Sequence, residues 1–170
     1  MSILLSQMIL LMALPALMIY ACFSDLFTMR ISNRLCLTVV GAFLVFALVA
    51  TLPPLLVAWH LLAGLMVLIV SFSLFSFGWI GGGDAKFVAA VAVWFGFGQL
   101  WEFMAVSSIL GGGLTLGLLM LRNHPIPQAM VRIGWINKLH DKRTGVPYGI
   151  ALGVTGIMLL PFGMAWQIIV

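Results

Sequence analysis

The sequence predicts an all-α membrane protein, a polytopic bundle of about six transmembrane helices. Two features of its composition support this class. The chain of 170 residues is 64% hydrophobic and only 7% charged, with a mean hydropathy of +1.22, whereas soluble domains carry roughly 25% charged residues. The third observation is that no polar run is long enough to fold alone. We therefore expect one membrane-embedded domain over residues 1–170.

Apolar runs of the length of a membrane helix define the expected elements, because a helix needs about 20 residues to cross a bilayer. The expected spans are approximately 3–24, 35–52, 55–77, 85–98, 101–121 and 146–169, with a loop over 122–145. Pro53 and Pro54 end the second span. Pro15 lies inside the first, where a membrane helix tolerates proline with a kink.

The long apolar run 85–121 decides the topology. As one helix it would exceed a bilayer of about 30 Å, since each residue adds about 1.5 Å. A turn near 96–102 divides it into two spans and leaves every basic residue on one side of the membrane. These residues are Arg30, Arg34, Lys86, Arg122, Arg132, Lys138, Lys142 and Arg143. Because basic loops stay in the cytoplasm, we expect both chain ends outside, with Glu102 as the only charge in the outer loops.

The net charge of +4 does not indicate a nucleic-acid partner, because the basic residues are few and lie between apolar runs. The expected environment is the lipid bilayer. Cys22 and Cys36 lie in or beside apolar runs without a C-x-x-C motif or a Cys/His cluster, so we expect no metal site and no cofactor. Residues 127–139 mix apolar and basic side chains, which suits either a short amphipathic helix in the membrane interface or a solvated basic loop.

Two of the four acidic residues are candidates for chemistry. Asp25 ends the first expected span at the inner side, and Asp84 begins the fourth at the same side, so both carboxylates lie at a similar depth. Ionisable residues within spans are costly and usually functional. The alternative is that each acid only marks a helix end, where Asp84 would be favoured by the helix dipole. Glu102 and Asp141 are most simply interfacial and solvated charges.

Neighbouring carboxylates do not readily ionise together, so Asp25 and Asp84 would share a proton. One member then accepts a proton as water attacks a carbonyl, and the other donates a proton to the carbonyl oxygen. This is the chemistry of aspartic peptide hydrolysis, and it needs no metal. Lys86 follows Asp84 by two positions and could favour an ionised carboxylate or hold a substrate carbonyl; the alternative is a membrane anchor facing the inside.

The glycines before Asp84 give the segment access to unusual geometry. Gly81, Gly82 and Gly83 lack Cβ, so they can adopt positive φ and let another backbone, such as an extended substrate, come close. The alternative is a turn with close helix packing. A second triplet at 111–113 has no acid nearby and is expected to serve packing only.

Three segments resemble one protein family. "GGGDAK" at 81–86 is similar to the G-x-G-D-x-K motif of type IV prepilin peptidases, which are membrane aspartic peptidases. "DLFTMRISN" at 25–33 resembles their first-aspartate segment, with Ser32 where proline is usual. "VPYG" at 146–149 resembles the opening of their last span. The matches occur in the family's order and cover most of the chain.

The resemblance implies catalytic roles for Asp25 and Asp84. It implies a supporting loop formed by Gly81, Gly82, Gly83 and Lys86, and structural support from Arg30, Asn33, Pro147, Tyr148 and Gly149. The family removes a short basic leader from prepilins and pseudopilins at the cytoplasmic face of the bacterial inner membrane. The implied partners are a prepilin or pseudopilin helix and the pilus assembly machinery. The chain lacks the family's insert with paired C-x-x-C motifs and looks like the short type of tight-adherence (Flp) systems, so we do not expect methyltransferase activity.

Other functions remain open on the sequence. A presenilin-like intramembrane protease shares the G-x-G-D motif and the chemistry, and would differ in its substrates. A non-enzymatic assembly subunit would tolerate asparagine at Asp25 and Asp84. A proton- or ion-coupled transporter would place its acids nearer the bilayer midplane and would show internal repeats, and no repeat is visible here.

Overall fold

The computed structural model describes residues 2–125, 127 and 132–167, and this part of the chain is built from helices joined by turns. The elements are α1 (Ser2–Thr28), α2 (Asn33–Val49), α3 (Pro54–Ser76), α4 (Gly82–Leu121), α6 (Gly134–His140), α7 (Tyr148–Leu159), the 3-10 helix η1 (Leu160–Phe162) and α8 (Met164–Gln167). The predicted all-α class is confirmed for the described residues.

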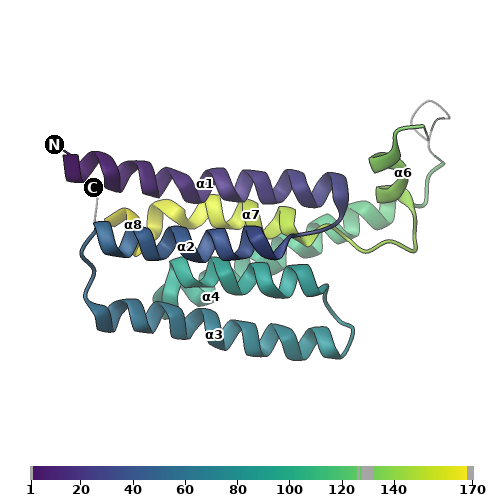
Figure 1. Ribbon diagram of the computed structural model, residues 1–170. Helices are drawn as coiled ribbons and strands as arrows, with labels where there is room; N and C mark the ends of the chain where they lie inside the picture. Colours follow the sequence, from purple (N-terminus) through teal and green to yellow (C-terminus); the bar gives the residue numbers. More distant parts are fainter. Residues whose placement is uncertain (1, 126, 128–131, 168–170) are drawn as a thin grey trace.

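The long helices form a bundle whose two ends differ in charge. α1 packs against α2 and α7, α4 packs against α2, α3 and α7, and α3 lies at the edge with α4 as its principal neighbour (Figure 1). The α1–α2 turn, the α3–α4 loop, α6 and the approach to α7 lie at one end, and the first and last described residues lie at the other (Figure 1). Every basic residue of the chain is in or beside a segment of the α6 end.

α4 is interrupted at Gly96, whose φ of 58° and ψ of −171° are not helical. In a regular helix the N–H of Phe97 would bond to the carbonyl of Val93. Here the ring of His60 occupies that place, with Nδ1 2.8 Å from the Val93 oxygen. A Cβ on Gly96 would lie 2.8 Å from Cε1 of this ring. A buried histidine on α3 therefore bonds to a carbonyl of α4 beside the interruption.

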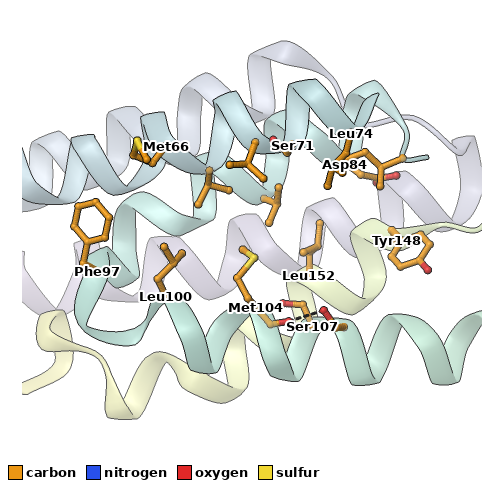
Figure 2. A pocket seen from close by; sticks show the side chains of 15 residues that line it. Met66, Ser71, Leu74, Asp84, Phe97, Leu100, Met104, Ser107, Tyr148 and Leu152 are labelled. Atoms are coloured by element: carbon orange, nitrogen blue, oxygen red, sulfur yellow. Dashed lines mark hydrogen bonds between the residues drawn. The ribbon is translucent and has the colours of Figure 1, made fainter. Parts of the chain in front are cut away.

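The second half of α4 runs back alongside the first, as Figure 2 shows. In an uninterrupted helix Asp84 and Gly111 would be about 40 Å apart. Instead, Tyr148 lines a cavity with Asp84, and its ring lies so close to Gly111 that an added Cβ would be 2.5 Å from Cε1. The division of residues 85–121 into two spans requires such a reversal of the chain. Where each span enters and leaves the membrane stays a prediction.

The core and the surface are both apolar, as a bilayer requires. Trp94 is buried against Phe43 and Phe46, and its indole N–H donates to the carbonyl of Val39 at 3.0 Å. Many large apolar side chains face outward, including Leu48 at 78% exposure. By length and composition, the described residues contain three helices able to cross a membrane: Leu11–Thr28, Pro54–Ser76 and Gly82–Leu121. The chain is a membrane protein.

Two expected segments end differently in the structure, and a third is described only in part. α1 continues to Thr28, so Asp25 lies within its last turn and not at its end. The span expected over 146–169 does not form one helix, because α7 ends at Leu159 and Pro161, which has no N–H to donate, follows in η1. Of the segment 127–139, the part from Gly134 is helical in α6, and residues 128–131 lie outside the described residues.

Candidate active site

Asp25 is held by a backbone donor from the far end of the sequence. Its side chain is 4% exposed, and Oδ2 accepts a hydrogen bond of 2.7 Å from the N–H of Gly149, 124 positions away. Gly149 lies in the first turn of α7, where backbone N–H groups have no partner within the helix. The carboxylate of α1 thus takes one of the free donors of α7, and the positive end of the α7 dipole faces it.

The neighbours of this hydrogen bond explain why a proline and a glycine stand at positions 147 and 149, at the start of α7. A Cβ on Gly149 would lie 2.8 Å from Oδ2 of Asp25 and 2.7 Å from Cδ1 of Ile31, so no larger side chain fits. Pro147 is fully buried, and its ring restricts the backbone directly before the helix. Pro147 and Gly149, expected as structural support, lie where they can fix the position of the donor.

Asp84 lies in the first turn of α4, a favourable place for an acid beside a helix N-terminus, and its side chain is half-buried. A Cβ on Gly81 would be 2.8 Å from Oδ2 of Asp84. A Cβ on Gly82 would be 3.1 Å from the ring of Phe75. These glycines therefore let the carboxylate fold back over the loop and let the end of α3 pack against it.

Gly83 brings the Asp84 segment close to the Asp25 segment through Ile31. A Cβ on Gly83 would lie 3.4 Å from Cβ of Ile31 and 3.5 Å from its backbone nitrogen. Because Cδ1 of Ile31 also approaches Gly149, this buried side chain in the α1–α2 turn lies between the segment that carries Asp84 and the segment that carries the donor of Asp25. The sequence reasoning did not select Ile31, since an isolated isoleucine in a turn carries no signal of this role.

The backbone of the glycine triplet corrects one expectation. Positive φ was expected as one use of residues 81–83, but among the described residues the glycines with positive φ are Gly78 and Gly96. Gly81 has a φ of −71°. Close approach and not left-handed conformation explains two of these glycines, because Asp84 and Phe75 lie within 3.1 Å of where the Cβ atoms of Gly81 and Gly82 would be. A Cβ on Gly83 would make an ordinary contact with Ile31 at 3.4 Å.

Asp25 and Asp84 line the same cavity, which has a volume of about 1070 Å³. The cavity lies at the α6 end, and its walls come from the α1–α2 turn, the α3–α4 loop and the segment before α7. Gly81, Gly82 and Gly83 also line it. The fold thus brings together two acids that are far apart in the sequence, in a space large enough for a short stretch of peptide.

The remaining expected residues divide into two groups. Arg30 and Tyr148 line the cavity, and the carbonyl of Arg30 accepts hydrogen bonds from Ser24 Oγ and Thr28 Oγ1, both at 3.2 Å. These bonds close the α1–α2 turn.

Asn33 also lines the cavity, but its Oδ1 accepts a bond of 3.0 Å from Nζ of Lys86. Lys86 is exposed and lines a neighbouring cavity with Cys36, and it is not among the described residues that line the cavity of the two acids. Its observed contact links α4 to α2.

Tyr148 connects the cavity to the second glycine triplet. Its ring lies over Gly111, and its hydroxyl is 3.1 Å from Oγ1 of Thr115, to which it is hydrogen-bonded. The packing expected for 111–113 therefore includes a residue of the candidate site. Only the pairing of distant segments reveals this, because Gly111 is separated from both acids in the sequence.

A second cavity, which we call the apolar groove, continues from the first into the membrane region. It has a volume of about 480 Å³ and lies between α3, the two halves of α4 and α7. Figure 2 shows Asp84 and Tyr148 at one end of the groove and Phe97 at the other. Ile80, Asp84 and Tyr148 line both cavities, so the groove leads to the acids.

Metal ligation is not indicated by the geometry of the described part of the chain. Within residues 2–125, 127 and 132–167, no group of three His, Cys, Asp or Glu side chains gathers as metal ligands would. The acidic side chains that the fold brings to the cavity, among the residues described as lining it, are Asp25 and Asp84.

Comparison with known proteins gives one match. A family model described as the type IV leader peptidase family matches residues 12–116, more than half of the chain. The matched region includes Asp25, Asp84 and the first glycine triplet, and it ends before the segment that contains Gly149. Searches of curated proteins and of solved structures gave no match.

Proposed function

Because the chain belongs to the type IV leader peptidase family, we propose that it is a membrane aspartic endopeptidase that removes the short basic leader of prepilin-like substrates. The family resemblance inferred from the sequence motifs is thereby confirmed, and a peptidase activity follows from it. The proposal of an aspartic mechanism rests on the observation that Asp25 and Asp84 line one cavity. We place the protein in the bacterial inner membrane, with its active site near the cytoplasmic face.

The proposed reaction uses the two carboxylates and one water molecule. One carboxylate accepts a proton from the water as its oxygen attacks the scissile carbonyl, and the protonated partner donates to the carbonyl oxygen. The proton taken from the water then passes to the leaving amine as the C–N bond breaks. The Gly149 N–H holds Asp25 in one orientation, so this carboxylate need not reorganise during the reaction.

The charge distribution supports the cytoplasmic face. All eight lysines and arginines are in or beside segments at the α6 end of the bundle, where the cavity of the two acids also lies. Basic segments are retained on the cytoplasmic side of a bacterial membrane. A leader cleaved there would not have to cross the bilayer before hydrolysis.

The apolar groove supports a substrate that is itself a membrane helix. From Asp84 to Phe97 the groove follows the first half of α4, about 20 Å at 1.5 Å per residue. Its volume suits side chains from one face of a helix and not a whole helix. An apolar substrate helix beside α3 would place the residues before its first turn at Asp84, where the peptide is extended enough to be cut.

The direct test is cleavage of a co-expressed Flp-type prepilin, followed by a mobility shift on a gel. Wild type, Asp25→Asn and Asp84→Asn are compared at equal membrane levels, with Asp141→Asn as the control because Asp141 is an exposed acid of the α6–α7 loop. We expect wild type and Asp141→Asn to cleave and the other two variants to leave the prepilin intact. Cleavage at the wild-type rate by either of those two would contradict the proposal. Failure of wild type to cleave any prepilin would favour a presenilin-like protease with other substrates.

A further inference from the structure

Arg122 is a buried arginine outside the matched family region, and it ends α4. Arg122 is only 6% exposed, whereas Lys138, Lys142 and Arg143 of the adjoining segment are exposed. Burial of a guanidinium is costly unless its donors are paired. A hydrophobic residue would fill the same space at lower cost, so the hydrogen bonds of Arg122 indicate its role.

All the observed bonds of the Arg122 side chain go to the segment that leads into α7. Nε donates to the carbonyl of Leu139 at 2.9 Å, and one terminal nitrogen donates to the carbonyl of Gly145 at 2.8 Å and to Oγ1 of Thr144 at 3.2 Å. The same Thr144 hydroxyl bonds to the carbonyls of Lys138 and Asp141, at 2.6 and 2.8 Å. The guanidinium thus joins the end of α6 to the start of the connection to α7.

The stretch of chain from Gly145 to Gly149, which links the contact of Arg122 to the contact of Asp25, is short and stiff. Gly145, whose carbonyl Arg122 holds, is followed after three residues by Gly149, whose N–H holds Asp25. Between them Pro147 is fully buried and has a ring-restricted φ of −75°. A displacement of Gly145 would therefore move the donor of Asp25, because few freely rotating bonds separate them.

We propose that Arg122 is a positioning residue for the active site: it fixes segment 145–149 so that the Gly149 N–H stays on the Asp25 carboxylate. The effect on catalysis rests on the proposed function, whereas the effect on the backbone does not. Arg122 acts through this segment, and it is not among the described residues that line the cavity of the two acids. Its role differs from that of an exposed basic residue that only orients the protein in the membrane.

The shape of the side chain explains why this position carries arginine. The planar guanidinium presents donors in fixed, different directions, and two of its nitrogens reach acceptors on residues 139, 144 and 145. A lysine keeps the charge but offers a single nitrogen on a flexible stem. Arg122→Lys should therefore retain membrane orientation and lose part of the positioning.

The first readout is amide hydrogen exchange, which does not depend on peptidase activity. We compare wild type, Arg122→Gln and Arg143→Gln, the last being an exposed arginine of the same connection. In Arg122→Gln the amides of segment 148–150 should exchange about tenfold faster or more, because the Gly149 N–H opens more often. In the same variant, the amides of α3 should exchange at the wild-type rate. In Arg143→Gln, all amides should exchange at the wild-type rate. Wild-type protection of Gly149 in Arg122→Gln would overturn the proposal, whatever the substrate proves to be.

The second readout is steady-state cleavage of a prepilin. Misplacement of a catalytic group should lower kcat about 10- to 100-fold in Arg122→Gln. KM should change by a much smaller factor, because most residues that line the groove belong to α3 and α4 and not to segment 145–149. Arg122→Lys should fall between this variant and wild type, and Arg143→Gln should match wild type. A wild-type kcat, or an effect confined to KM, would overturn the proposal. If Arg122→Gln does not accumulate in membranes, Arg122→Lys decides by both readouts, and wild-type exchange and kcat there would overturn it.

Discussion

Oδ2 of Asp25 lies 2.7 Å from the backbone nitrogen of Gly149, which donates a hydrogen bond to it from the first turn of α7. A helix that follows the α6–α7 connection thereby orients an acid of the first helix. Because the donor is a backbone group, no side-chain deletion removes it. Its position can instead be tested by adding volume at Gly149, where the space for a Cβ is taken.

Gly149→Ala should slow catalysis while leaving the bundle folded. The added methyl group would meet Asp25 Oδ2 at 2.8 Å and Ile31 Cδ1 at 2.7 Å, so the carboxylate must move. We expect kcat for prepilin cleavage to fall about 10-fold to 100-fold. Gly41→Ala on α2, where a Cβ meets nothing within 4 Å, is the control. Equal activity of the two variants would mean that the Asp25–Gly149 contact does not matter for turnover.

Gly111→Ala and Gly112→Ala should differ although the residues are neighbours. A Cβ on Gly111 would lie 2.5 Å from the ring of Tyr148, which lines both cavities, whereas a Cβ on Gly112 meets nothing within 4 Å. We expect Gly111→Ala to lower kcat/KM about tenfold by displacing this ring, and Gly112→Ala to match wild type. Cleavage assays at matched membrane levels give the comparison, and identical rates would remove Tyr148 from the site.

Lys86→Gln should have a small effect on the chemical step. Lys86 is exposed and donates to Asn33, and the amide of glutamine can still reach toward α2. Exposed polar contacts of this kind contribute roughly 0–1 kcal/mol, so we expect kcat to change by about fivefold or less. A loss of kcat comparable to that of Asp84→Asn would instead support the direct role in catalysis that the motif position suggests.

Val70→Trp should impair substrate binding more than Ile69→Trp. The two residues are adjacent on α3 and similarly exposed, 56% and 55%, but Val70 lines the apolar groove and Ile69 does not. A tryptophan in the groove would occupy space proposed for the substrate helix. We expect KM to rise about tenfold for Val70→Trp, as the loss of one large apolar contact implies. A KM that rises equally in both variants would argue against the groove as the docking site.

Gly96→Ala should destabilise the fold more than Gly98→Ala. The φ and ψ of Gly96 lie in a region that only glycine populates, which costs other residues about 1–3 kcal/mol. The methyl group would also meet the ring of His60 at 2.8 Å, whereas a Cβ on Gly98 meets nothing within 4 Å. Thermal unfolding of the purified proteins should show a lower Tm for Gly96→Ala. A Tm equal to that of Gly98→Ala would contradict the reversal at this residue.

The features that the sequence predicted are those with a local or compositional cause. Apolar runs predicted helices, and the excess charge on one side of the bundle follows from where these runs stop. Asp25 and Asp84 were selected because an acid beside an apolar run needs a reason, and the fold places both on one cavity. The turn near 96–102 was inferred from length, and the interruption at Gly96 lies at its first position.

The features that the sequence did not predict depend on contacts between distant segments. The donor of Asp25 is a backbone group, so residue type alone could not indicate its role. The bond of His60 to the carbonyl of Val93 joins α3 to α4, and nothing in the sequence around His60 indicates it. Arg122 was grouped with the other basic residues, because its burial becomes visible only when α6 and the connection to α7 are folded over it.

The joint action of Asp25 and Asp84 is tested most directly by the initial rate of prepilin cleavage. The rate is compared for purified wild type, Asp25→Asn, Asp84→Asn and the double variant. If the two carboxylates act as one unit on a single water molecule, each single change removes the whole contribution of the pair. We then expect each single variant to lose about 1000-fold or more in kcat and the double variant to be no worse than either. A double variant whose loss is the product of two modest single losses would show that the two carboxylates act independently and not as a pair.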